Sequence, residues 1–291
     1  MPTNEICAVV VTYHPQPRDF ENLRILREQV DDLVVVDNGS SADVRDRLQS
    51  ASRDLNFALI EHGENLGIGA GLNTGVKWAE RRGSKWVALF DQDSRVTDGF
   101  IAQMLADFHE SAIQRAVLLI IPGYRDPHTA VERVCALDSD GGPFVTITSG
   151  SMLPIVAFQR LGYFREDLFI YTVDDEFSLR LRSMGYSIAL SSRAILLHKS
   201  GSPTYTQMWG IRFSTTNYKA AVRYYVSRNR VWMIRHYGSA YPRWARGAVR
   251  ASIVDICKLL IAEKSKLDKL GMIAYGVWHG VRGRLGRTVA I

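Results

Sequence analysis

The sequence predicts an α/β fold in which helices cover a mostly parallel sheet on both faces. Apolar runs with the length of buried strands alternate with segments that have helical spacing. The chain has 291 residues, 46% of them hydrophobic, so it can bury one large core with an appendage or two smaller cores. In parallel sheets of this kind, ligands bind beyond the carboxyl ends of the strands.

The first 122 residues contain the clearest of these elements. Buried strands are typically short apolar runs that end in turn residues, whereas helices show steps of three and four between apolar positions. Strands are expected at 5–14, 32–40, about 57–62, 85–94 and 116–122, and helices at 20–30 and 71–82.

The net charge of +6 is concentrated at the end of the chain. Residues 241–291 hold ten Lys or Arg and three acids, a net of +7, whereas residues 1–240 carry −1. A nearly neutral body with a basic tail is a poor fit to a nucleic-acid enzyme and suits a protein that visits a membrane surface. A basic helix surface that is merely solvated is the alternative.

Cysteine content and hydropathy predict a cytoplasmic protein. Cys7, Cys135 and Cys257 are far apart and odd in number, which argues against a disulfide framework and against a zinc finger. No cleavable leader is expected at the N-terminus, and no apolar run approaches the roughly 18 residues that a membrane span needs.

Polar residues close the predicted strands. Asp91 and Asp93 form an Asp-x-Asp pair after an apolar run, and carboxylates in this arrangement can hold Mg²⁺ or Mn²⁺ together with diphosphate oxygens. His198 ends another apolar run and is a candidate third ligand. The alternatives are ordinary turn residues for the two acids and a structural role for the histidine.

Three consecutive acids begin a predicted helix. Asp174, Asp175 and Glu176 precede apolar positions with helical spacing. One of these carboxylates could be a general base, since neighbouring acids raise each other's pKa. Acids at a helix N-terminus are also favoured by the helix dipole, which is the structural alternative.

The stretch 55–75, LNFALIEHGENLGIGAGLNTG, is rich in glycine, but its spacing does not fit the dinucleotide fingerprint G-x-G-x-x-G. A phosphate loop of the G-x-x-x-x-G-K-[ST] type is also missing. A nucleotidyltransferase is therefore a weaker candidate.

The end of the chain has the pattern of two amphipathic helices interrupted near Glu263. These helices could dock on the catalytic domain, bind a membrane surface or form a dimer.

Several segments together resemble the family 2 glycosyltransferases, and within them the bacterial rhamnosyltransferase branch. They are VVVDNGS, ENLGIGAGLNTG, LFDQDS, TSGSMLP, LGYFREDLFIYTVDDEFSLRLRSMGY and YYVSRNR, in an order that covers about residues 5–235. The resemblance implies the GT-A fold, an αβα nucleotide-binding sandwich. It further implies domains at 1–238, divided into a nucleotide-sugar half at 1–95 and an acceptor half at 96–238, with a helical extension at 239–291.

The resemblance also implies roles for individual residues. Asp93 is expected to be the more direct metal ligand of the Asp-x-Asp pair, and Asp174, six residues before Arg180, the catalytic base. Glu176 supports the site from behind the reacting groups. The expected nucleotide-binding residues are Thr12, Tyr13, Asp37, Asn65, Gly67, Asn73, Asp91 and Gln92; the candidates for contacts with the acceptor or a phosphate are Glu176, Arg228 and Asn229.

The function implied is metal-dependent transfer of a sugar with inversion, and L-rhamnose from dTDP-L-rhamnose is the expected donor. Leu72 stands where many family members have Arg, which favours the rhamnosyl branch. A glycan or polyprenyl-linked acceptor places the enzyme in O-antigen or capsule synthesis, peripheral at the inner face of the cytoplasmic membrane. The alternatives are a UDP- or GDP-linked donor and a noncatalytic nucleotide-sugar-binding scaffold.

Overall fold

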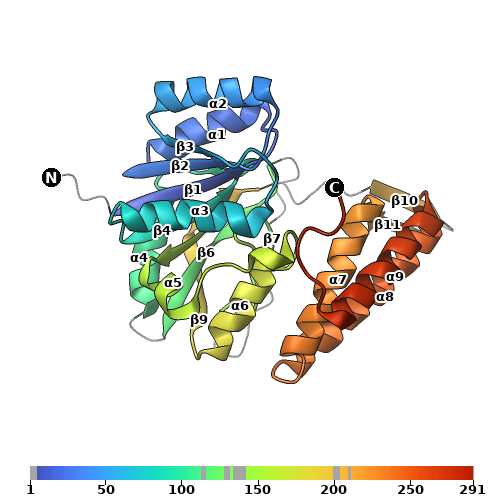
Figure 1. Ribbon diagram of the computed structural model, residues 1–291. Helices are drawn as coiled ribbons and strands as arrows, with labels where there is room; N and C mark the ends of the chain where they lie inside the picture. Colours follow the sequence, from blue (N-terminus) through green and yellow to red (C-terminus); the bar gives the residue numbers. More distant parts are fainter. Residues whose placement is uncertain are drawn as a thin grey trace. The chain divides into compact units, whose positions relative to one another are not determined.

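The computed structural model describes residues 5–112, 116–127, 132–133, 142–198, 204–208 and 211–290. Cys135 lies outside the described residues. The chain forms two compact units. Figure 1 shows the chain coloured from blue at the N-terminus to red at the C-terminus. The first comprises Met1–Glu166 and Val173–Lys199, and the second Asp167–Thr172 and Ser200–Ile291. These units divide the chain near residue 200, whereas the functional boundary at 238/239 stays a prediction.

Four parallel strands form one half of the sheet in the first unit. They are β1 (Ile6–Thr12), β2 (Asp32–Asp37), β3 (Ala58–Glu61) and β4 (Trp86–Asp91), in the order β3-β2-β1-β4. Figure 1 shows them stacked below α1 and α2. The four strands confirm the predicted ones, although each ends earlier than expected because the polar residues after it turn away.

The other half of the sheet is mixed. It contains β8 (Ser151–Pro154), β6 (Val117–Arg125), β9 (Ser187–Leu197), β5 (Arg95–Val96) and β7 (Glu132–Arg133). The strand β8 is antiparallel to both β4 and β6, and β9 is parallel to β6. The predicted strand at 116–122 is confirmed and continues past Pro122, where the pairing with β9 is irregular.

Helices pack on this sheet. They are α1 (Pro17–Arg27), α2 (Ala42–Leu55), α3 (Ile68–Arg81), α4 (Phe100–Ala112), α5 (Val156–Leu161) and α6 (Val173–Ser183), and a 3₁₀ turn η1 spans Glu166–Leu168. The helix α3 packs on β1, β2 and β4, and α4 packs on β6 and β9. This packing holds the parallel strands β1, β2 and β4 in place, and with them the loops that follow their carboxyl ends.

The glycines of α3 have a packing role. A Cβ atom on Gly71 would lie 2.7 Å from Val11 Cγ1, and one on Gly75 would lie 2.2 Å from Val9 Cγ1. Both valines are buried in β1. The helix can therefore approach the strand this closely only where side chains are missing, so these two glycines are explained by the contact between helix and sheet rather than by the approach of a nucleotide.

The described part of the second unit contains a β-hairpin and three helices besides Asp167–Thr172. The hairpin pairs β10 (Thr204–Met208) with β11 (Ile211–Thr215), and the helices are α7 (Ala220–Tyr237), α8 (Pro242–Ala262) and α9 (Lys266–Arg282). The helix α9 packs along α7. The predicted interruption is confirmed, since α8 ends before Glu263 and Ser265 adopts a left-handed conformation with φ 52°.

Candidate functional site

Polar side chains from neighbouring strands meet at the carboxyl edge of the parallel sheet. Thr12 of β1 is in register with Asp37 of β2, and Val11 of β1 is in register with Asp91 of β4. The strand ends therefore lie side by side in the place where α/β sheets bind their ligands.

Asp37 is fully buried and is held in one orientation. Its carboxylate accepts hydrogen bonds from Thr12 Oγ1 at 3.2 Å, Ser40 N at 2.9 Å and Ser40 Oγ at 2.5 Å. Beside it, the Tyr13 N–H donates to Gln92 Oε1 at 2.7 Å. Four residues expected to bind the nucleotide thus lie together, although their contacts with a nucleotide stay a prediction.

The loop before α3 is shaped by Asn65. Its Oδ1 accepts hydrogen bonds from Asn38 Nδ2 at 3.1 Å and from Gly67 N at 2.9 Å. Gly39 has φ +91°, and a Cβ there would lie 2.4 Å from the backbone carbon of Glu64. Asn65 and Gly67 therefore shape the loop that borders the carboxyl edge of the parallel sheet.

Asp91, Asp93 and His198 form a cluster that could hold a metal ion. Each offers one ligand atom, and these atoms all lie within 4.8 Å of one another. The two acids come from the end of β4, while His198 follows β9, whose Leu197 is paired with Arg95 of β5. The tertiary structure thus brings the Asp-x-Asp pair and the distant histidine together.

Two serines orient this cluster. Ser94 Oγ lies 2.9 Å from His198 Nδ1 and 2.6 Å from Ser149 Oγ, and Ser149 Oγ accepts a hydrogen bond from Asp91 N at 3.1 Å. The contact with Ser94 fixes the orientation of the imidazole ring beside the two carboxylates. A hydrogen bond to one ring nitrogen is a typical support of a histidine ligand.

Negative charge accumulates around Asp91. Burial, with added repulsion from Asp93 and Asp174, raises the pKa of Asp91 to about 7. A divalent cation would relieve this repulsion, and carboxylate and imidazole donors suit Mn²⁺. The donor set therefore fits the predicted metal, and the predicted base Asp174 lies close enough to influence the cluster.

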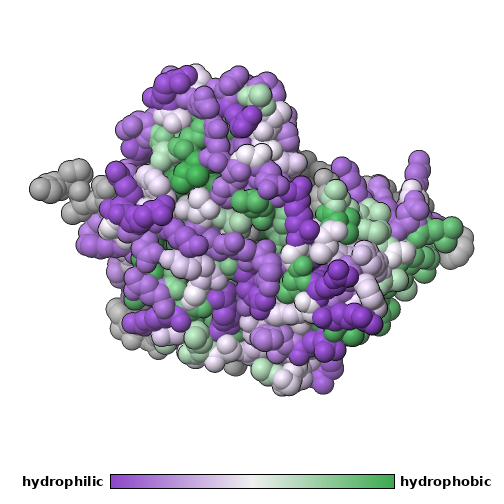
Figure 2. Space-filling model, in the orientation of Figure 1, coloured by the Kyte–Doolittle hydropathy of each residue, from purple (hydrophilic) through white to green (hydrophobic). Residues whose placement is uncertain are grey.

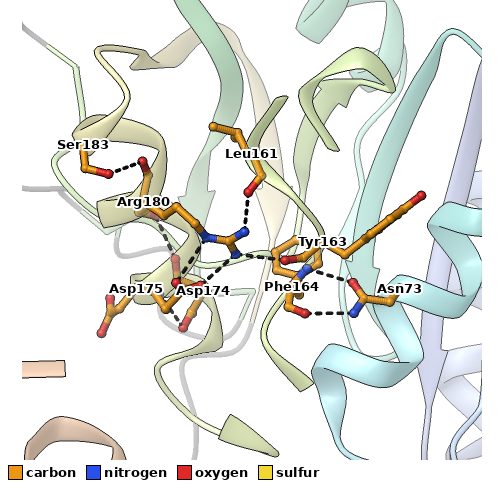
Figure 3. Close-up of polar contacts among 10 residues, drawn as sticks. Asn73, Leu161, Tyr163, Phe164, Asp174, Asp175, Arg180 and Ser183 are labelled. Carbon is orange, nitrogen blue, oxygen red and sulfur yellow. Dashed lines mark hydrogen bonds and ion pairs between the residues drawn. The ribbon is translucent and has the colours of Figure 1, made fainter. Parts of the chain in front are cut away.

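Helix α6 carries Asp174 in its first turn, and an ion pair between Glu176 and Arg180 fixes this helix. Glu176 is buried, and its carboxylate accepts hydrogen bonds from Arg180 Nε at 3.2 Å and Nη2 at 2.8 Å. Arg180 also donates to Leu161 O at 2.6 Å and to Tyr163 O at 2.9 Å (Figure 3). Glu176 thus fixes α6 through this ion pair, while its support of the site and its contact with an acceptor or a phosphate stay predictions.

Asn73 has a role that the sequence did not indicate. Its side chain is buried and exchanges hydrogen bonds of 2.9 Å with both the N–H and the carbonyl of Phe164 (Figure 3). It also donates to Glu166 Oε1 at 2.8 Å. The amide group is occupied in joining α3 to the segment before η1. Its position therefore favours a structural role over the expected nucleotide contact.

Comparison with known proteins agrees with this geometry. Residues 8–129 match the family model described as glycosyl transferase family 2. The chain is 26% identical over 298 residues to the dTDP-rhamnosyl transferase RfbF of Shigella flexneri, and the similarity covers 97% of each chain. Residues 8–129 therefore form a glycosyl transferase family 2 domain. The chain is a glycosyltransferase.

Solved structures share the fold of this glycosyltransferase. S. aureus TarS 1-349 matches with a TM-score of 0.56 and 15% identity over 96% of this chain and 72% of its own, although the chain spans only 37% of a longer TarS structure. The mannosyltransferase PcManGT from Pyrobaculum calidifontis, in complex with GDP-Man and Mn²⁺, matches with a TM-score of 0.53 and 16% identity over 99% of this chain and 76% of its own. At such identities the likeness establishes the GT-A fold.

Arg228 and Asn229 lie in the core of the second unit. Both are fully buried. Arg228 donates to Gly286 O at 2.6 Å and Leu168 O at 2.9 Å, and Asn229 Nδ2 donates to Leu168 O, Ile170 O and Tyr171 O at 2.7–3.0 Å. Arg228 is therefore shielded from solvent, and its position favours a structural role over the phosphate contact, which stays a prediction.

A cavity of about 250 Å³ adjoins Asp93, and sequence reasoning missed most of its lining. Its walls include Arg18 and Asn22 of α1, Arg95 of β5 and Leu197 of β9. Two guanidinium groups next to Asp93, a candidate metal ligand, suit a phosphorylated ligand. The available signal was Arg95, which follows the Asp-x-Asp pair by two residues, whereas Arg18 is brought in by the packing of α1 next to β5.

Proposed function

We propose that the enzyme transfers L-rhamnose from dTDP-L-rhamnose, with inversion, to a hydroxyl group of a glycan or polyprenyl-linked acceptor during O-antigen or capsule synthesis. The observation that carries the donor is the similarity to a dTDP-rhamnosyl transferase along 97% of both chains. Leu72, in place of the arginine of many family members, agrees with this donor.

Asp174 acts as the general base in this proposal. The acceptor oxygen forms a bond to the anomeric carbon while its proton passes to the Asp174 carboxylate, and the bond from that carbon to the diphosphate breaks with its electron pair on the diphosphate. Asp174 belongs to the first turn of α6, and its charge acts on Asp91.

Asp91, Asp93 and His198 would hold a divalent cation, with Mn²⁺ favoured over Mg²⁺ because imidazole is among the donors. When bound, the cation supplies positive charge that stabilises the leaving diphosphate. Arg18 and Arg95 add positive charge on the Asp93 side of the cavity. These arginines supply the cationic contacts that Leu72 cannot make.

Thermal unfolding with a panel of nucleotide sugars tests the donor, since a ligand that binds the folded state raises its stability. The largest rise is expected with dTDP-L-rhamnose together with Mn²⁺, and the rise should disappear with a chelator. A larger shift with UDP- or GDP-linked sugars would refute the rhamnosyl donor and leave the reaction class intact.

Variants test the two catalytic roles. Asp174→Asn should reduce turnover by at least about a hundredfold while the thermal shift with the donor persists. Asp93→Asn should remove both turnover and the metal-dependent part of the shift. Asp46→Asn, an exposed residue of α2, is the matched control. Near-normal turnover of Asp174→Asn would exclude this base, and a wild-type chain that binds but transfers nothing would favour a noncatalytic scaffold.

A further inference from the structure

The second unit has its polar and apolar residues in unusual places. The residues of α9 that are buried are Lys269, Gly276, His279 and Gly280, which are polar or lack a side chain. A Cβ on Gly276 would lie 2.4 Å from Tyr224 O, and one on Gly280 would lie 2.5 Å from Arg228 O. The helix α9 therefore meets α7 through its small residues and leaves its apolar stripe outside.

The outward stripe of α9 is strongly apolar. Leu267, Ala274, Trp278 and Val281 recur in steps of seven, four and three, which places them on one helix face. Leu267 is 85% exposed, and Trp278 and Val281 are 43% and 48% exposed. Burying such a stripe is favourable at roughly 25 cal/mol for each Å² removed from water.

The helix α8 is even less covered. Of its 21 residues, Leu259 is the buried one, while Val249, Ile253 and Leu260 are exposed on a common face. Figure 2 shows hydrophobic surface over this region at the right of the view. A long apolar helix with so little buried surface is expected to be covered by another structure.

Basic residues surround these apolar side chains. Arg246 and Arg250 share the exposed face of α8, and Lys266 and Arg282 flank the stripe of α9. The guanidinium carbon of Arg282 lies 4.8 Å from the centre of the Trp278 ring, and an aromatic ring of this kind can sit at a membrane interface. Glu263 is buried in ion pairs with Arg223 and Lys269, whereas Asp268 is an exposed acid beside Leu267.

We infer that the exposed faces of α8 and α9 bind the surface of an anionic lipid bilayer. Apolar side chains ringed by Arg and Lys match the boundary between acyl chains and anionic headgroups. A second copy of this chain fits less well, because a two-fold interface would bring the same basic residues against one another. Among the described residues, none of the helices has the length and apolar character that crossing a bilayer requires, so the helices would lie in the surface.

Vesicle flotation of the full chain tests this inference without any sugar nucleotide. The outcome is therefore independent of the proposed reaction. The chain should float with vesicles of phosphatidylcholine and phosphatidylglycerol, bind vesicles of phosphatidylcholine alone much more weakly, and lose affinity as salt is raised. Failure to float with the anionic vesicles would overturn the inference.

Two double variants test the faces separately. Arg246→Gln with Arg250→Gln should weaken binding about 25-fold, at about fivefold for each basic residue, and Ile253→Gln with Leu267→Gln should weaken it by roughly tenfold or more. The matched controls on the first unit are Arg47→Gln with Arg53→Gln, and Val156→Gln with Met184→Gln. Losses of equal size in the controls would refute the assignment to these faces. If the chain does not bind anionic vesicles but forms a dimer, and Ile253→Gln with Leu267→Gln disrupts that dimer, the face belongs to a contact with a second copy instead.

Discussion

Replacing Arg228 by Met should strongly destabilise the second unit. The side chain is fully buried, and its guanidinium donates to Gly286 O at 2.6 Å, Leu168 O at 2.9 Å and Asn229 Oδ1 at 2.8 Å. Leu168 O would keep the bond from Asn229, so two acceptors would lose their donor. An unsatisfied buried polar group costs about 1–3 kcal/mol, which gives a loss of about 2–6 kcal/mol.

Urea unfolding followed by circular dichroism measures this loss, and hydrogen exchange of residues 167–172 shows whether their hold on α7 is released. Arg235→Met, an exposed position of the same helix, is the matched control. The reasoning is refuted if Arg228→Met stays within about 0.5 kcal/mol of the wild type. If its KM for the donor rises at the same time, Arg228 is the phosphate contact that the sequence predicts.

Two further predictions concern packing and pH. Gly75→Ala should lower the free energy of unfolding by about 1–3 kcal/mol because its Cβ would meet Val9 Cγ1 at 2.2 Å, whereas Gly247→Ala on α8, with open space around it, should raise it by up to about 1 kcal/mol; equal effects in thermal unfolding would contradict this. Burial alone would raise the pKa of Glu263, but hydrogen bonds from Lys269 and Thr215 and the charge of Arg223 outweigh it and lower that pKa. Glu263 therefore stabilises the fold above the ordinary glutamate pKa of about 4.3, and this contribution is lost as the pH falls through that range toward the lowered value. Glu263→Gln should reduce the loss of unfolding free energy below about pH 4.3. An unchanged dependence on pH would refute the stabilising role of the ion pairs of Glu263 with Arg223 and Lys269.

Local patterns located the candidate site because its chemistry is carried by strand ends. Asp37 and Asp91 end apolar runs, and parallel strands bring such ends to one edge of a sheet. The grouping of His198 with Asp93 could only be suspected, since 104 residues separate His198 from Ser94, the serine that contacts it. For Asn73 and Arg228, a polar residue that binds a ligand and one that satisfies backbone groups in the core look identical in a sequence.

The sequence by itself determined the class of fold, the positions of the first four strands along the chain, the acidic residues that follow strands or begin a helix, and the break between the last two helices. These features follow from hydropathy period and turn chemistry, which depend on neighbours in the chain. Only the tertiary structure decided which polar residues are buried, as with Arg228 and Asn73, and which apolar residues are left outside, as with Ile253 and Leu267. Burial depends on which faces of distant elements meet, and in the second unit the small residues of α9 turned its apolar stripe outward.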